Sequence, residues 1–266
     1  RKIAPGGSIV EFTWHSNPVF VTYAARVLLE NSLGGSDSFE LRFHGTTVTA
    51  GGKTLSVNGE NYRVKGIQET PGNGIEAPDA TRAAIKERLQ KFGRLGANTI
   101  RTHRPSIALV DLALDAGMMV VPVMEGGWER TVIALREFPN ILYWDISSDN
   151  PREMARAAET VAALDPYNRP AGFSGELEGI PFTGGNNQVS IYGAVPELHP
   201  GICGTFNPEI RSGMPVVLLG WASRDSGRIP LAMENKRRKL WKECVLDDMA
   251  RGAFYFLPGD ETAPLP

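Results

Sequence analysis

The stretch ILYWDISSDN, residues 141–150, is typical of a buried strand that ends in polar residues and passes into a helix. Four apolar or aromatic residues open it, Asp145, Ser147 and Asp149 follow, and Pro151 stands where the first helical turn is expected. A continuous apolar run favours a strand covered on both faces, as in a parallel sheet. Parallel α/β proteins keep their chemistry where such strands end, so this stretch predicts a fold class and a candidate site together.

The same alternation of strand and helix recurs from Tyr62 onward. Ile85, Leu89 and Phe92, for example, lie at helical spacing and are followed by Gly96, where a helix would stop. The expected strands cover 62–67, 98–102, 119–123, 141–147, 169–174, 189–194, 214–221 and 253–258. Eight such units predict an α/β fold, a (β/α)8 TIM barrel. A doubly wound open sheet is the alternative, less favoured because no Gly-rich phosphate turn follows an early strand.

The first part of the chain instead alternates like antiparallel strands. The expected strands cover 8–14, 19–29 and 38–44, with a hairpin over 46–57 and a left-handed turn at Asn58-Gly59. We therefore expect a β-rich segment over residues 1–45 and the barrel over 46–266. Three strands are too few for an independent sandwich, so whether the first 37 residues form part of one or pack under the barrel stays open.

Composition excludes several classes of partner. The 266 residues carry a net charge of −2, which provides no basic field for nucleic acid or an anionic membrane surface. No apolar run approaches the roughly 20 residues that span a bilayer, so we expect no membrane insertion of this segment. Cys203 and Cys244 lack zinc-ligand spacing, and we expect no metal and no cofactor. The cellular location stays open, with an extracytoplasmic or periplasmic one favoured.

The ends of the expected barrel strands carry acids, aromatic residues and a few arginines. Carboxylates and indoles together suit a sugar, because they bind hydroxyl groups and cover the face of the ring. We therefore expect an oligosaccharide or polysaccharide as the partner, with other domains of the same protein as further candidates. The candidate binding residues are Arg101, His103, Glu125, Trp128, Trp144, Glu176, Tyr192, Trp221 and Asp225.

Several segments together resemble glycoside hydrolase family 2 of clan A. They are SFELRFHGTTVTAGGKTLSVNGENYRVKGI (38–67), LGANTIRTHRPS (95–106), LALDAGMMVVPVMEG (112–126), ILYWDISSDN (141–150) and PVVLLGW (215–221). The resemblance implies that an immunoglobulin-like domain, partial here, passes into a TIM barrel. It also implies that Arg101 braces a catalytic carboxylate and that Glu125 matches the acid that ends the third strand.

The departures from the family pattern fall on its catalytic positions. Aligned on Trp144, the acid/base glutamate corresponds to Asp149, whose carboxyl falls about 1 Å short, a displacement that costs on the order of 10²-fold. Aligned on Pro215, the nucleophile corresponds to Gly220, which has no side chain. Gln68 and Glu69 stand where the family has a histidine, and His103 is one residue early. A retaining mechanism needs two carboxyl groups about 5 Å apart, and the aligned positions supply at most Asp149.

Structural alternatives exist for the main candidates. Asp149 could cap the following helix or interact with its dipole, Arg101 could form an ion pair inside the barrel, and Trp144 could pack in the barrel wall beside the pocket. The amino-acid sequence does not show whether the side chain of Asp145 points into the barrel or towards the helices.

Three functions follow from these observations. The first is a catalytically degenerate barrel that binds a glycan or serves as an interaction domain in a larger carbohydrate-related protein. The second is an active β-glycosidase or transglycosidase that uses a displaced pair, such as Asp149 with Glu176 or Asp225. The third is a structural domain that assembles with partner chains. The substitutions at Asp149 and Gly220 favour the first.

Overall fold

The computed structural model describes residues 22–30, 34–51, 54–68, 74–148, 150–174, 189–194, 216–218 and 252–256. The predicted strand over 8–14 and both cysteines lie outside these ranges.

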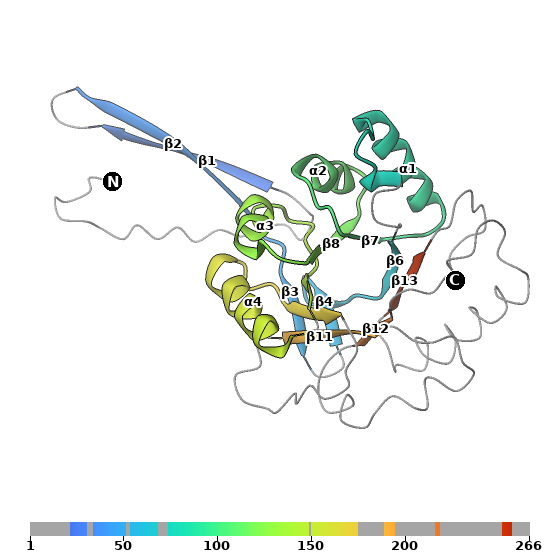
Figure 1. The fold of residues 1–266 in the computed structure, drawn as a ribbon. Helices are drawn as coiled ribbons and strands as arrows, with labels where there is room; N and C mark the ends of the chain where they lie inside the picture. Colours follow the sequence, from blue (N-terminus) through green and yellow to red (C-terminus); the bar gives the residue numbers. More distant parts are fainter. Residues whose placement is uncertain are drawn as a thin grey trace, which may run out of the picture.

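Eight parallel strands pair in a closed ring, which we call the barrel (Figure 1). The ring closes where β13 pairs with β6 from Gly252↔Val64 to Phe256↔Gln68, a pairing that an open sheet would not make. All eight strands lie where the sequence predicted them. They are β6 (Val64–Gln68), β7 (Thr99–Thr102), β8 (Met119–Met124), β9 (Trp144–Ser147), β10 (Ala171–Ser174), β11 (Val189–Ala194), β12 (Val216–Leu218) and β13 (Gly252–Phe256).

A helix follows each of the first four barrel strands (Figure 1). These are α1 (Arg82–Arg94), α2 (Ile107–Asp115), α3 (Trp128–Leu135) and α4 (Pro151–Leu164), with the short helix η1 (Gly74–Glu76) before α1. Side-chain oxygens of Thr81, Ser106 and Asn150 accept hydrogen bonds from the first turns of α1, α2 and α4, as N-caps do. The described residues thus have a mixed α/β fold with a parallel sheet, as predicted.

The inside of the barrel is closed at the end where its strands begin. The small antiparallel sheet β3 (Val48–Gly51), β4 (Thr54–Val57) and β5 (Glu60–Asn61) contributes the fully buried Leu55, which belongs to the same apolar cluster as Val64 and Phe254. The ring of Phe254 lies where a β-carbon on Gly66 would be, so the glycine permits this packing. The predicted turn is confirmed, because Asn58 and Gly59 have positive φ angles of 53° and 80°.

A separate antiparallel hairpin extends away from the barrel (Figure 1). Its strands β1 (Thr22–Glu30) and β2 (Ser36–His44) pair from Thr22↔His44 to Glu30↔Ser36, which confirms two of the three predicted N-terminal strands. The rings of Tyr23 and Phe43 stack with centroids 5.6 Å apart. A boundary between domains at residues 45 and 46 stays a prediction.

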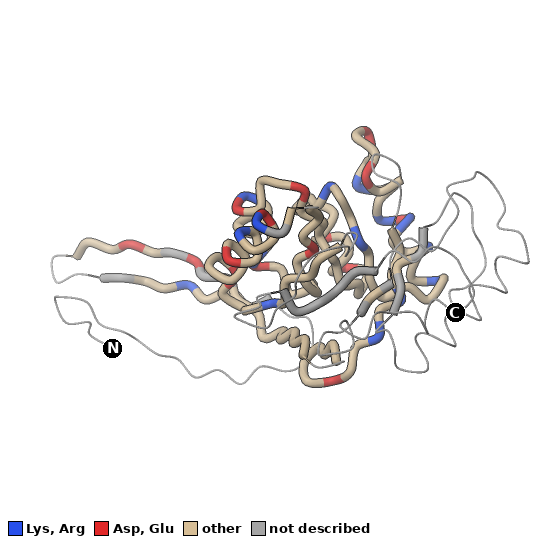
Figure 2. Tube along the Cα trace, turned by 60° about the horizontal axis from the view of Figure 1, so that its bottom comes forward, with Lys and Arg blue, Asp and Glu red and all other residues tan. Residues whose placement is uncertain are grey.

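Charge is mixed rather than segregated. Figure 2 shows acidic and basic residues interspersed along the described part of the chain. Among the described residues, no helix is both long enough and apolar enough to cross a membrane.

The packing of the β3–β5 sheet against the barrel, which we call the plug, can be tested by substituting two leucines. Leu55→Ala should lower the free energy of unfolding by about 2–5 kcal/mol, because it opens a cavity in a closed apolar cluster. Leu28→Ala is the matched control, since Leu28 is 57% exposed, and should change stability by less than about 0.5 kcal/mol. Urea unfolding of both variants measures the difference; equal effects would show that Leu55 does not belong to a packed plug.

Candidate functional site

A buried ion pair joins two strands inside the barrel. Nε of Arg101 on β7 donates to Oδ2 of Asp145 on β9 at 2.6 Å, and the two side chains are only 5% and 2% exposed. Asp145 therefore points into the barrel, which settles the orientation that the sequence left open. Arg101 takes the barrel ion pair that was the structural alternative for it.

The remaining contacts of Arg101 reach two further strands. Its Nη1 donates to Oε1 of Gln68 at the end of β6 at 2.7 Å, and its Nη2 donates to Oγ of Ser174 at the end of β10 at 3.0 Å. One guanidinium thus links the carboxyl ends of β6, β7, β9 and β10. We call these strand ends, with the loops that follow them, the barrel mouth.

His103 extends this network outward. Its Nδ1 lies 2.7 Å from Oε1 of Glu125, at the end of β8, and its Nε2 lies 3.0 Å from Nε2 of Gln68 and 3.3 Å from Nη1 of Arg101. Its backbone N–H donates to the buried carboxylate of Glu76 at 2.7 Å.

The hydrogen bonds fix the proton on the His103 ring. The Gln68 oxygen accepts from Arg101, so the Gln68 nitrogen can only donate, as can the guanidinium. Nε2 of His103 must therefore accept, which leaves the proton on Nδ1, where it is donated to Glu125. Both ring nitrogens of His103 are therefore engaged within the protein.

The described mouth therefore brings together three of the predicted residues, Arg101, His103 and Glu125. Glu125 is the accessible one, with a side chain that is 62% exposed and only one oxygen engaged by His103. Trp128, at the start of α3, is half-buried, and its indole N–H has no hydrogen-bond partner. Trp128 packs against the apolar cluster of the helical layer. Glu125 can accept hydrogen bonds from a polar ligand, whereas Asp145 is enclosed and paired with Arg101.

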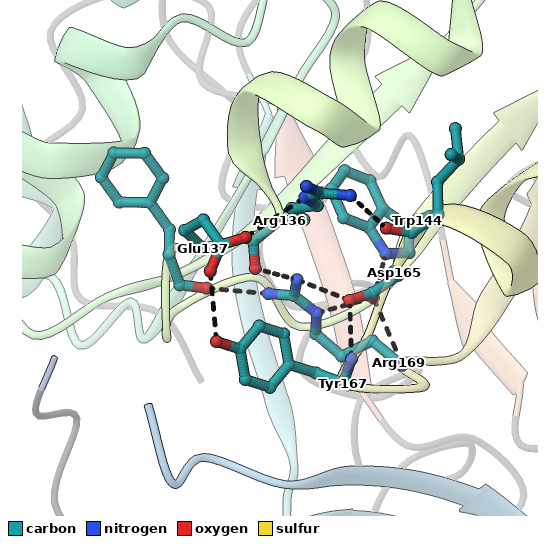
Figure 3. A network of polar contacts seen from close by, with 8 residues as sticks. Arg136, Glu137, Trp144, Asp165, Tyr167 and Arg169 are labelled. Carbon is teal, nitrogen blue, oxygen red and sulfur yellow. Dashed lines mark hydrogen bonds and ion pairs between the residues drawn. The ribbon is translucent and has the colours of Figure 1, made fainter. Parts of the chain in front are cut away.

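The structure corrects the binding role expected for Trp144. This side chain is fully buried, and its indole N–H donates to Oδ2 of Asp165 at 2.8 Å, away from the mouth (Figure 3). It belongs to the apolar cluster that also contains residues of α4, so packing in the barrel wall is its role.

The other predicted residues lie where side chains are not described. Asp149, Glu176, Trp221 and Asp225, together with Gly220, fall outside the described ranges, and Tyr192 is placed in β11 by its backbone alone. Their roles stay predictions. The N-cap of α4 is Asn150, whose side chain accepts from the backbone N–H of Arg152 at 3.0 Å.

Two contributors to the mouth were not predicted. Ser174 is the last residue of β10, and this position at a strand end was a signal. Serine is too common where strands pass into loops for that signal to single it out. Glu76 ends the short helix η1 between β6 and α1, and no sequence period places a residue of such a short helix beside His103. No group of three His, Cys, Asp or Glu side chains suited to a metal ion occurs among the described residues.

Comparison with solved structures identifies the architecture. A β-glucuronidase of Ruminococcus gnavus, in complex with an N1-substituted uronic isofagomine, superposes with a TM-score of 0.68 at 13% identity over 90% of this chain and 51% of that one. A glycosyl hydrolase family 2 (GH2) β-galacturonidase of Eisenbergiella tayi bound to galacturonate gives 0.65 at 22% identity over 90% and 51%. A GH2 member from Bacteroides cellulosilyticus gives 0.62 at 16% identity over 90% and 33%.

The chain has a GH2-like fold. Identities this low show the fold alone, and the chain spans about a third to a half of the length of those proteins. No model of a protein family matches the sequence, and no curated protein matches it. The resemblance read from the sequence is thereby confirmed at the level of the fold.

The ion pair at the mouth of the GH2-like barrel can be tested by removing one partner. Arg101→Met leaves Asp145 buried and unpaired, so the free energy of unfolding should fall by about 3–5 kcal/mol. The double variant Arg101→Met/Asp145→Leu should recover part of that loss, because no uncompensated charge remains.

Arg82→Met serves as the control for this prediction. Arg82 forms an ion pair of similar length with Asp111, at 2.7 Å, but both side chains are exposed, so its loss should cost less than about 1 kcal/mol. Urea unfolding measures all three variants. A double variant as unstable as Arg101→Met would contradict the assignment of the loss to an unpaired Asp145.

Proposed function

We propose that this chain forms a (β/α)8 barrel of the GH2 type that binds a glycan at its mouth and has lost hydrolytic chemistry. The observation that carries the proposal is the state of the mouth carboxylates. Asp145 is enclosed and paired with Arg101, and Glu125 is engaged by His103. A retaining pair would have to come from the aligned positions, which hold Asp149 and Gly220.

The accessible groups at the mouth support glycan binding. Glu125 offers a carboxylate oxygen to sugar hydroxyl groups, and Trp128 lies close behind it in the chain, where an indole can cover a sugar ring. Arg104 is exposed next to His103 and supplies a cation. Two of the similar structures are named for glucuronide and galacturonide chemistry, so a uronic acid is the first ligand class to test.

The share of the similar proteins that the chain covers supports a role within a larger assembly. A barrel of this size accounts for a third to a half of those chains, so we propose that it works beside other domains of a carbohydrate-related protein. An extracytoplasmic or periplasmic location is part of the same proposal. The near-neutral charge supports a glycan rather than a nucleic acid as partner.

Binding and turnover can be measured side by side. Calorimetric titration with glucuronate and galacturonate oligosaccharides should give saturable binding, which Glu125→Ala weakens about tenfold by removing a charged hydrogen-bond acceptor. Glu129→Ala, an exposed carboxylate on α3, should leave affinity unchanged. Aryl β-glucuronides and β-galacturonides should show no hydrolysis above the uncatalysed rate.

Hydrolysis that Asp149→Ala abolishes would overturn the loss of chemistry and favour a displaced carboxylate pair. Absence of binding to every oligosaccharide would overturn the binding role and leave an assembly domain.

A further inference from the structure

We propose that His44 is an acid-sensitive latch that holds the β1–β2 hairpin against the barrel. This inference concerns the N-terminal hairpin rather than the mouth, so it does not depend on the proposed function. It rests on a contact between the last residue of β2 and the loop that follows α4.

The contact is a stacked pair of rings. The imidazole of His44 lies 3.7 Å from the ring of Tyr167, centroid to centroid, with an angle of 18° between the planes. His44 is only 6% exposed, and among the hairpin residues whose side chains are described it is the one that is buried. The other described hairpin side chains are half-buried or exposed, as Leu28 is at 57%. The stack therefore provides the main described attachment of the hairpin.

Tyr167 is held rigidly by the cluster behind it (Figure 3). Its hydroxyl group donates to Glu137 at 3.2 Å and its backbone N–H donates to Asp165 at 3.1 Å. The guanidinium of Arg169 lies 5.3 Å from the centroid of the Tyr167 ring and is bound to both oxygens of Asp165. Arg169 also donates to the backbone carbonyl groups of Arg136 and Phe138, so its charge is fixed in place.

This surrounding does not accommodate a protonated His44. Neither ring nitrogen has a hydrogen-bond partner of good geometry, and the backbone groups of Arg136 and Thr46 that lie near the ring offset only part of the cost of a buried charge. The charges that act on the ring are those of Arg169 and Asp165, and Tyr167 stacks on it. The other titratable groups of this cluster are Arg136 and Glu137, of which Glu137 is bound to the Tyr167 hydroxyl group. Arg169 lies on the far face of Tyr167 and repels a second cation, whereas Asp165 is already paired with Arg169.

The titration of the cluster agrees with this geometry. Burial, and then the positive charge of Arg169, lower the pKa of His44 to about 4, against weaker opposing effects of Asp165 and backbone groups. Burial and the carboxylate of Glu137 raise the pKa of Tyr167, so this ring stays neutral. Burial raises the pKa of Asp165, but its hydrogen bonds and ion pair with Arg169 lower it further, so the net shift is downward and the acid stays ionised.

The direction of the pH effect follows from these states. In a released hairpin His44 is in water, with an ordinary pKa of about 6.5, so the released state takes up a proton more readily than the latched state. The latch is at full strength above about pH 6.5 and weakens as the pH falls towards the folded pKa of about 4. Over that interval we expect the ratio of latched to released hairpin to fall on the order of 100-fold.

The experiment measures the distance between the hairpin and α4 by double electron–electron resonance between two spin labels. Spin labels are placed at Leu28→Cys on the hairpin and Glu159→Cys on α4, both exposed, with Cys203 and Cys244 replaced by Ser. The otherwise native protein should show a narrow distance distribution near pH 7.5, which broadens between about pH 6 and pH 4.

Two substitutions at His44 separate the latch from other acid effects. His44→Phe keeps a flat ring against Tyr167 and does not titrate, so its distribution should stay narrow throughout. His44→Lys carries a permanent charge and should give a broad distribution already near pH 7.5; if that variant does not fold, the comparison with His44→Phe decides alone.

Circular dichroism at each pH reports whether the barrel stays folded. If the distance distribution of His44→Phe broadens at the same pH as that of the protein with His44, the proposal is overturned, because another group must then be responsible for the titration. A native distribution that stays narrow down to pH 4 would also overturn it, as would broadening that occurs only together with loss of the barrel signal.

Discussion

The ion pair between Arg101 and Asp145 is the constraint on which the upper half of the barrel depends. Two charges enclosed at 5% and 2% exposure must be matched, since breaking such a pair costs about 3–5 kcal/mol. The remaining N–H groups of Arg101 must also find acceptors, and they find them on Gln68, His103 and Ser174. The contacts with Gln68 and Ser174 fix the ends of β6 and β10, so much of the shape of the mouth follows from satisfying one buried cation.

Strand β9 connects this site to the cluster on the opposite side of the barrel wall. Successive side chains of a strand point to opposite faces, so Asp145 enters the barrel while Trp144 enters the layer of helices. Trp144 then donates to Asp165, which positions Arg169 and, through it, Tyr167 (Figure 3). The ring of Tyr167 in turn stacks on that of His44. Adjacent residues of one short strand thus take part in the mouth network and in the attachment of the hairpin.

How far the sequence predicts this arrangement depends on the kind of pattern involved. The eight barrel strands are predictable, because each is an apolar run bounded by helices or turns, and burial dominates their choice of structure. The sequence does not predict which of Trp144 and Asp145 points into the barrel, because a strand that is buried on both faces has no polar face to mark its orientation. The assignment of Trp144 to the mouth failed for this reason, and Asp145 could be placed only once its arginine partner was known.

Capping and loop geometry limited the prediction in a different way. Asp149 and Asn150 are both good helix caps, and the backbone alone decides that Asn150 takes that position. Glu76 reaches His103 from the short helix η1, which is too short for a periodic pattern to place it. Pairings between distant loops depend on the closed ring that brings them together, so local patterns do not contain them.

The same network limits what the described part of the mouth can offer a ligand. A guanidinium has five N–H groups, and four contacts engage that of Arg101 within the protein, so little capacity remains for an incoming ligand. Both ring nitrogens of His103 are engaged as well, by Gln68, Arg101 and Glu125. Among the described residues, Glu125 and Arg104 are exposed, so a polar ligand at the described mouth would meet these two side chains before the enclosed pair of Arg101 and Asp145.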